Sequence, residues 1–205
     1  MDLLVATTNP GKFVEVQAFL SHLSLRILSS KDLPDPPAVV EDGDTFEANA
    51  LKKARTLAQF SGLMTLADDS GIEVDALGGA PGIYSARYCG VEGDDERNND
   101  KLLGELQAVA TEQRTARYVC VLALCIPGAG GMKEWLARET CEGRIGFKRV
   151  GSQGFGYDPL FFFPPFGKTF GEIDRERKAT VSHRGKALKR FAEALPSLRD
   201  FALSP

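Results

Sequence analysis

The most informative segment of the chain is Leu3-Leu4-Val5-Ala6-Thr7-Thr8-Asn9-Pro10-Gly11-Lys12. Residues 3–7 form a short run, apolar up to Thr7, that is typical of a buried strand, and turn formers follow. From Phe13 the apolar residues recur at helical spacing, at Val16, Leu20 and Leu23. The segment therefore predicts a strand, a tight loop and a helix. Backbone N–H groups at such a helix start, together with Lys12, favour the binding of an anion. The alternative interpretation is an ordinary N-capped helix with an exposed lysine.

The rest of the chain continues the alternation of strands and helices. We expect further strands at 26–29 and 63–67, and helices at 45–61, 94–106 and 183–195. In the last of these helices, helical spacing predicts a buried face formed by Ala187, Leu188, Phe191 and Leu195. Asp44 suits the N-cap of the second helix, and Gly62 ends it. Two long strands, 114–126 and 133–144, joined by the glycine-rich turn 127–131, predict a hairpin. The pattern indicates a mixed α/β fold: one central β-sheet flanked by helices, in a single domain over 1–205.

Composition narrows the class of protein. With 205 residues and a formal net charge of −3, the chain has no global positive field, so binding to nucleic acid is not expected. No apolar stretch approaches the roughly 20 residues that span a bilayer, and no signal peptide precedes the first strand, so we expect a cytoplasmic protein with no membrane partner. The four cysteines form no C-x-x-C pair, which favours reduced thiols over a zinc site.

Acidic residues suggest a metal site. Asp68 and Asp69 follow the predicted strand 63–67, and side chains alternate along a strand, so we expect only one of the two to face a given site. The other would make structural hydrogen bonds to nearby backbone. Glu41 precedes the second helix. Two carboxylates from separate segments can hold one Mg²⁺ ion, with water and phosphate oxygens completing its octahedral coordination. The alternative is that each acidic side chain is a solvated loop charge or caps a helix.

Three further segments have unusual composition. Residues 78–88 hold three glycines and a proline within five positions, which marks a shaped loop rather than a helix. In 154–159, Phe155 or Tyr157 can stack on a purine and Asp158 can read its edge, although core packing explains aromatic residues equally well. The third segment, 182–184, is Ser-His-Arg at a helix start, where a structural histidine is as plausible as a functional one.

Taken together, these segments resemble the inosine/xanthosine triphosphate pyrophosphatase family. The resemblance runs from Leu4 to about Leu195, and six motifs occur in the family's order. They are T-x-N-x-x-K at 7–12, an acidic residue before T-F-x-x-N-A at 45–50, A-D-D-S-G at 67–71, L-G-G-x-P-G-x-Y-S-A-R-Y at 77–88, G-F-G-Y-D-P at 154–159 and S-H-R at 182–184. The family hydrolyses deaminated purine nucleotides (ITP, dITP, XTP and dXTP) to the monophosphate and pyrophosphate, with Mg²⁺.

The resemblance also implies a fold and a role for individual residues. It implies two lobes with an active-site cleft between them, and usually a homodimer. Asp69 matches the family's catalytic acid and metal ligand, and Glu41 a second metal ligand. The positions that match substrate contacts are Thr7, Thr8, Asn9, Pro10, Gly11, Lys12, Lys53, Ser70, Phe155, Gly156, Tyr157, Asp158, Lys178, His183 and Arg184.

One position departs from the family's pattern. Many members carry Glu immediately before the Asn of T-F-x-x-N-A, whereas this chain has Ala48, preceded by Glu47. On a helix, one position rotates the carboxylate by about 100°. This departure keeps open a nucleotide-binding regulator without turnover. Two other functions also stay open: a pyrophosphatase with another base preference, and an RNA-binding module suggested by the basic residues near the C-terminus.

Overall fold

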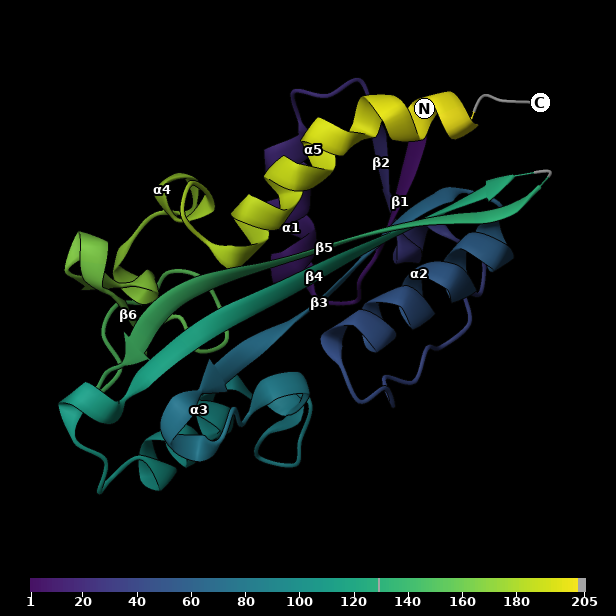
Figure 1. Ribbon diagram of the computed structural model, residues 1–205. Coiled ribbons are helices and arrows are strands. Elements are labelled where there is room, and N and C mark those ends of the chain that lie inside the picture. Colours follow the sequence, from purple (N-terminus) through teal and green to yellow (C-terminus); the bar gives the residue numbers. More distant parts are fainter. Residues whose placement is uncertain (129, 203–205) are drawn as a thin grey trace. The chain divides into compact units, whose positions relative to one another are not determined.

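A computed structural model describes residues 1–128 and 130–202. Its strands form one sheet in the order β2-β1-β3-β4-β5-β6-β7 (Figure 1). The strands are β1 (Asp2–Ala6), β2 (Arg26–Ser29), β3 (Met64–Val74), β4 (Thr115–Gly128), β5 (Gly131–Ile145), β6 (Phe161–Phe163) and β7 (Lys168–Thr169). β1 runs parallel to β2 and β3, and β6 runs antiparallel to β5 and β7. The predicted mixed sheet is confirmed.

With one short exception, the α-helices agree with the sequence prediction in type and approximate bounds. They are α1 (Pro10–Leu20), α2 (Phe46–Ser61), α3 (Asp95–Glu105), α4 (Arg175–Ala179) and α5 (His183–Ala202). Six 3₁₀-helices lie at Ser30–Asp32, Asp75–Leu77, Gly82–Arg87, Thr111–Gln113, Pro164–Phe166 and Phe170–Glu172. None of the helices within the described ranges is long and apolar enough to cross a membrane.

Several expectations need correction. β3 does not end at 67 but continues through Asp68 and Asp69 to Val74, because Ile72 and Val74 supply a further buried face. The segment 78–88, expected to be without helix, contains the 3₁₀-helix Gly82–Arg87. The prediction missed β6, β7 and α4, which are short. The hairpin of β4 and β5 is confirmed, and Ala129 of its expected turn and residues 203–205 of the expected domain lie outside the described residues.

The chain divides into two compact units. Unit 1 comprises Met1–Asp69, Cys120–Glu139 and the chain from Arg184 onward. Unit 2 comprises Ser70–Val119 and Thr140–His183. Each unit contains its own cluster of buried hydrophobic side chains. β3, β4 and β5 each contribute residues to both units, so the boundaries fall within strands.

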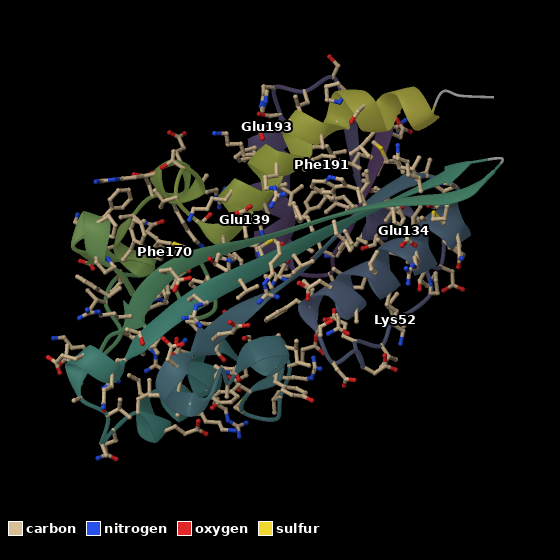
Figure 2. All side chains as sticks on the ribbon, in the orientation of Figure 1. Lys52, Glu134, Glu139, Phe170, Phe191 and Glu193 are labelled. Atoms are coloured by element: carbon tan, nitrogen blue, oxygen red, sulfur yellow. The ribbon has the colours of Figure 1, made fainter. Side chains whose placement is uncertain are left out.

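In unit 1 the sheet lies between α2 on one face and α5 on the other (Figure 1). Alternation along β5 shows this directly. Glu134 accepts hydrogen bonds from Arg55 of α2, with Nε 2.5 Å from the carboxylate, whereas Glu139 accepts one from Arg190 of α5 at 2.9 Å (Figure 2). The Trp135 ring, on the same side as Glu139, packs 5.9 Å from the Phe191 ring of α5. Odd-numbered side chains of this part of β5 therefore face α5, and even-numbered ones face α2.

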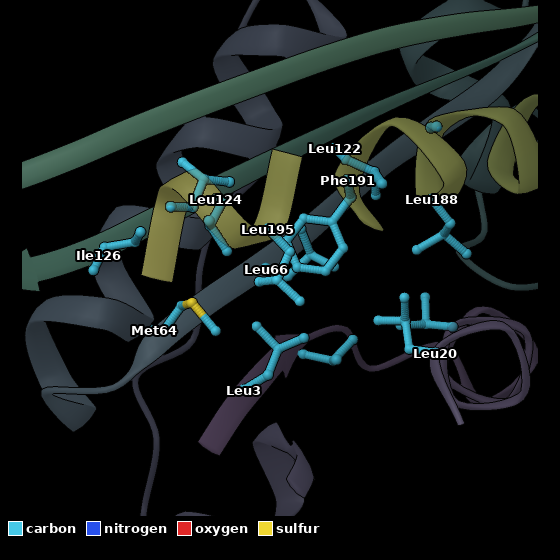
Figure 3. Close-up of a cluster of buried hydrophobic side chains, with 14 of the residues drawn as sticks. Leu3, Leu20, Met64, Leu66, Leu122, Leu124, Ile126, Leu188, Phe191 and Leu195 are labelled. Atoms are coloured by element: carbon cyan, nitrogen blue, oxygen red, sulfur yellow. The ribbon is translucent and has the colours of Figure 1, made fainter. Parts of the chain in front are cut away.

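The core of unit 1 fills the face of the sheet that α1 and α5 cover. It gathers apolar side chains from β1, β3, β4, α1 and α5 (Figure 3). The helical positions predicted for the core of α5 are all buried, namely Ala187, Leu188, Phe191 and Leu195. Of the four predicted for the first helix, Val16 and Leu20 are buried and the other two are partly buried. On the opposite face of the sheet, α2 presents small residues such as Ala50, Ala54 and Ala58, all fully buried.

Unit 2 has a core rich in aromatic side chains. Tyr118 of β4 lies against Phe161 of β6, with ring centroids 4.6 Å apart, and Phe161 lies 4.9 Å from Phe170. Leu102 and Leu106, at the end of α3, close the cluster from another side. The aromatic residues that follow position 160 therefore pack in the core of unit 2.

The N-cap of α2 is Thr45 rather than the expected Asp44. The Thr45 side chain accepts a hydrogen bond from the Ala48 N–H at 3.1 Å, whereas Asp44 is exposed. At the other end, Gly62 is the predicted stop, and its φ of 69° is the left-handed conformation that glycine adopts most easily.

We predict that Thr45→Ala lowers the free energy of unfolding by about 1 kcal/mol, because the Ala48 N–H loses its partner. Asp44→Ala is the matched control and is expected to change it by less than about 0.5 kcal/mol. Urea unfolding curves of both variants check this. An equal or larger loss from Asp44→Ala would show that the cap has been assigned to the wrong residue.

Candidate active site

The loop between β1 and α1 has the geometry of an anion site. Asn9 is the N-cap of α1, and its side chain accepts from the Lys12 N–H at 3.1 Å, while Pro10 begins the helix. The first turn of α1 holds no acidic residue. The Thr7 carbonyl accepts from Ser30 Oγ at 3.0 Å, which ties the loop to the end of β2. The predicted phosphate loop is therefore a helix N-terminus with exposed residues at positions 8–10.

Asp68 lies at the centre of a buried ion-pair network in unit 1. Its carboxylate is 2.7 Å from Lys12 Nζ and 2.8 Å from Arg184 Nε. Arg184 also pairs with Glu15 of α1, at 2.5 Å, and the Cys120 thiol donates to Asp68 at 3.1 Å. Burial alone would raise the pKa of Asp68, but Arg184 and Lys12 outweigh it and hold the pKa well below its ordinary value. Asp68 is thus an ionised anchor that joins α1, α5 and β4.

Asp69 has different partners, supplied by α2 and the loop before it. Lys53 Nζ lies 3.3 Å from Asp69 Oδ1 and 2.9 Å from Glu41 Oε1, and it also donates to the Asp68 carbonyl at 2.8 Å. The charges of Asp69 and Glu41 outweigh the effect of burial on Lys53, so its pKa is raised. One ammonium group therefore holds two carboxylates from separate segments together.

The two carboxylates differ in electrostatic environment. Burial raises the pKa of Asp69, and the opposing charges of Lys53 and Lys12 do not fully offset it. Burial acts in the same direction on Glu41, but Lys53 and Lys12 outweigh it and its pKa is lowered. Asp69 is only 5% exposed, and its Oδ2 atom is buried with no hydrogen-bond partner among the described residues.

This pair of carboxylates fits a divalent cation. A buried carboxylate oxygen without a partner, beside a second carboxylate, is the oxygen donor set that Mg²⁺ prefers. No group of three or more His, Cys, Asp or Glu within the described ranges is placed to hold a metal. A cation at Glu41 and Asp69 would therefore need water and substrate oxygens as its remaining ligands.

Strand alternation explains the division between the two aspartates. Asp68 shares a face of β3 with Leu66, which belongs to the core beneath α1 and α5. Asp69 faces the other way, where α2 lies, so the expectation that the two side chains diverge is confirmed. The contacts of the Asp68 carboxylate include two charged side chains and a thiol.

In unit 2, Asp158 organises the second set of predicted residues. It is 1% exposed, and its carboxylate accepts from Lys178 Nζ at 2.6 Å, from Tyr118 Oη at 3.2 Å and from the Phe155 N–H at 3.0 Å. The Lys178 ammonium also lies 5.1 Å from the centroid of the Phe155 ring. Gly154 has a φ of 77°, and a Cβ there would overlap the Asp158 carboxylate, so only glycine fits.

The remaining residues of unit 2 are held by aromatic and backbone contacts. Tyr157 is buried, and its hydroxyl donates to the Ser85 carbonyl at 2.8 Å. The His183 ring stacks on Tyr118, with centroids 4.6 Å apart and planes 7° apart. Sequence reasoning missed Tyr118, because it reads as one more apolar residue in the long strand 114–126. Its alternation with other inward positions predicts burial but not contact with Asp158.

Not every predicted residue joins one of these two groups by a described contact. Arg184 belongs with Asp68, not with His183, its neighbour in sequence. Ser70 is half-buried in β3, next to Asp69. At the position where the sequence departs from the family's pattern, Ala48 is exposed and Glu47 pairs with Arg138 of β5 at 3.0 Å. The acidic pair beside Lys53 therefore consists of Glu41 and Asp69.

Comparison of the sequence with known proteins identifies the family of this chain. The model of the Ham1 family matches residues 3–194. A dITP/XTP pyrophosphatase from Shouchella clausii (strain KSM-K16) is 48% identical over 195 residues, covering 95% of this chain and 96% of the relative. A second dITP/XTP pyrophosphatase, from Geobacter sulfurreducens (strain ATCC 51573 / DSM 12127 / PCA), is 52% identical over 186 residues, covering 91% and 92%.

A solved structure gives the same result for the fold. A HAM1 protein from Coxiella burnetii superposes with a TM-score of 0.86 at 35% identity, covering 96% of this chain and 99% of that one. The matched region contains the helix-start loop, both aspartates and the aromatic segment described above. The chain belongs to the Ham1 family.

Proposed function

We propose that this protein is a Mg²⁺-dependent nucleoside triphosphate pyrophosphatase that converts ITP, XTP and their deoxy forms to the monophosphate and pyrophosphate. The observation that carries the proposal is the pair Glu41 and Asp69, joined by Lys53, on a chain whose relatives are named dITP/XTP pyrophosphatases. Hydrolysis of an acid anhydride needs positive charge for the phosphates and an oriented water, and this group of residues can provide both.

The residues of unit 1 suit the triphosphate. A nucleoside triphosphate carries about four negative charges at neutral pH, because its terminal phosphate titrates near pH 6 to 7 as phosphate monoesters do. The α1 N-terminus presents N–H groups and the positive end of the helix dipole, and Lys12 lies in the first turn of this helix with its side chain 15% exposed. Lys53 adds a second ammonium beside Asp69. In this scheme Lys12 and Lys53 neutralise phosphate oxygens.

We assign the role of general base to Asp69. Its free Oδ2 can accept a proton from a water molecule while Oδ1 stays with Lys53, so the carboxylate is held in place during the reaction. Glu41 and Asp69 would hold Mg²⁺, which when bound supplies electrostatic stabilisation of the phosphates and lowers the pKa of bound water. The water oxygen attacks the α-phosphorus, its proton passes to Asp69, and the bond to the bridging oxygen breaks to release pyrophosphate.

Base recognition is assigned to unit 2. Phe155 is partly exposed and offers a ring for stacking. The N–H groups of Phe155 and Gly156 donate to the carboxylates of Asp158 and Asp95. We therefore assign the donor role to the Lys178 ammonium, which has three N–H groups and no acceptor. It suits the 6-carbonyl of inosine or xanthosine and leaves the 6-amino group of adenosine without a partner.

Isotope labelling tests the reaction. We expect ITP hydrolysed in H₂¹⁸O with Mg²⁺ to give labelled inosine monophosphate and unlabelled pyrophosphate, because water attacks the α-phosphorus. Addition of excess chelator should reduce the rate to background. Label in pyrophosphate, or release of inosine diphosphate and phosphate, would contradict the assigned site of attack. Full activity in chelator would contradict the metal. The cleft between lobes, the homodimer and the cytoplasmic location stay predictions.

A further inference from the structure

Gly156 lies in the aromatic segment 154–158, and both its backbone N–H and its carbonyl form hydrogen bonds with side chains of the first turns of α3. Its N–H donates to Asp95 Oδ2 at 2.7 Å, and its carbonyl accepts from Asn99 Nδ2 at 2.9 Å. Asp95 and Asn99 are four residues apart on α3, so their side chains project from the same face of the helix. Two side chains thus fix the backbone of one residue, which lies between Phe155 and Tyr157.

The orientation of the Asn99 amide is determined by its surroundings. Nδ2 donates to two carbonyl oxygens, those of Gly156 and Asp95, the second at 2.7 Å. The reverse orientation would place the amide oxygen against both carbonyls, which repel it. The side chain is 2% exposed, and its Oδ1 has no hydrogen-bond partner among the described residues. The Nδ2 group of Asn99 therefore links the Gly156 carbonyl to the backbone of α3, while its Oδ1 has no described hydrogen bond.

α3 itself is firmly placed within unit 2. Arg149 donates to the Glu96 carbonyl at 2.7 Å and to Asp100 Oδ1 at 2.9 Å. Asn98, next to Asn99, accepts from the Cys89 N–H at 2.7 Å, which connects the helix to the loop after Gly82–Arg87. A rigid helix is the support that a binding residue needs if its ring is to stay within a fraction of an ångström of the productive position.

We propose that Asp95 and Asn99 are positioning residues for base recognition, which set the place of the Phe155 ring and the Asp158 carboxylate by clamping Gly156. This inference rests on the proposed function. Phe155 precedes the clamped residue, and Asp158 follows two positions later and bonds back to the Phe155 N–H. Loss of the clamp releases the segment on the side of α3, so the base binds more weakly while the phosphate-binding residues of unit 1 keep their contacts.

The test compares Asp95→Ala, Asn99→Ala and the double variant with the wild type. We expect each single variant to raise KM for ITP and the Kd of inosine monophosphate about tenfold, as the loss of one well-made hydrogen bond implies. We expect kcat at saturating ITP to change less than about threefold, because Asp69 and Glu41 are untouched. Inhibition by pyrophosphate, which carries no base, should be unchanged in all three.

Two matched variants separate positioning from simple stability. Asp95→Asn keeps an oxygen acceptor for the Gly156 N–H and should restore a KM close to the wild-type value. Asp94→Ala removes the N-cap of α3, whose side chain accepts from the Arg97 N–H at 3.0 Å, but leaves the clamp in place. It should lower the unfolding midpoint without changing KM.

The outcomes distinguish the clamp from the proposed function. A wild-type protein that releases no pyrophosphate from ITP overturns the proposed function. An active wild type whose Asp95→Ala and Asn99→Ala variants keep the wild-type KM overturns the clamp alone. The clamp is also overturned if Asp94→Ala raises KM as much as they do, or if pyrophosphate inhibition weakens in parallel. Asp95 is half-buried at the helix surface, so its variants provide the test even if Asn99→Ala fails to fold.

Discussion

Asp69→Asn is expected to lower kcat for ITP by about 10²–10⁴-fold, the range that loss of a general base produces. The amide is isosteric with the carboxylate, so it keeps an oxygen 3.3 Å from Lys53 Nζ. What it loses is the negative charge and the buried Oδ2 that accepts the proton of water. The measurement is steady-state pyrophosphate release with Mg²⁺, alongside a thermal melt to confirm that the variant is folded.

Asp42→Asn is the matched control for this substitution. Asp42 is an exposed acid next to Glu41, it pairs with Lys52 rather than Lys53, and the same acid-to-amide change there should leave kcat unaffected. A folded Asp69→Asn variant with turnover within about threefold of wild type would remove Asp69 from the catalytic role, since that factor corresponds to well under 1 kcal/mol of barrier.

Asp68→Ala is expected to lower the free energy of unfolding by about 3–5 kcal/mol, because it leaves buried positive charges without their partner. Arg184 is 2% exposed and would lose one of its anionic partners while keeping Glu15, and Lys12 would lose the carboxylate at 2.7 Å. The Cys120 thiol would lose its acceptor as well. Urea unfolding followed by circular dichroism measures the change.

Glu134→Ala provides the comparison for Asp68→Ala. Glu134 also accepts two hydrogen bonds from an arginine, Arg55, but the pair lies at the surface, where such contacts contribute about 0–1 kcal/mol. Both variants remove a carboxylate that pairs with an arginine, so the difference between their losses of stability measures the effect of burial. If Asp68→Ala were no more destabilising than Glu134→Ala, the network around Asp68 would not be the anchor described above.

Substitutions of the two adjacent aspartates should therefore have different effects. Loss of Asp69 should reduce turnover in a stable protein, whereas loss of Asp68 should reduce stability and, through Lys12, phosphate binding. This difference follows from a single fact of strand geometry, that neighbouring side chains point to opposite faces.

Local sequence patterns were sufficient for most of the fold. The helical spacing of Val16 and Leu20, and of Phe191 and Leu195, predicted the buried faces of α1 and α5, because amphipathic periodicity directly reflects which side is covered. Glycine at 62 predicted the end of α2 for a similarly local reason. The choice between Asp44 and Thr45 as N-cap failed, because both residue types cap well and only the backbone geometry decides between them.

The partners of site residues could not be predicted in the same way. Asp68 and Arg184 are 116 positions apart, and Asn99 and Gly156 are 57 apart, so their contacts depend on the completed sheet rather than on neighbouring residues. Tyr118 looked like an ordinary strand residue until its ring and hydroxyl were seen against His183 and Asp158. The motif resemblance supplied the candidate residues of the site, whereas the structure supplied the contacts between them.

The most direct test of the proposed function is kcat/KM for pyrophosphate release from ITP, XTP, GTP, ATP and TTP under identical conditions with Mg²⁺. The assignment of Lys178 and Phe155 to base recognition predicts fast release from ITP and XTP and release slower by about 10²-fold or more from ATP, which lacks the 6-carbonyl. Equal values for all five substrates would contradict base recognition while leaving a pyrophosphatase. No release from any of them would contradict the enzyme.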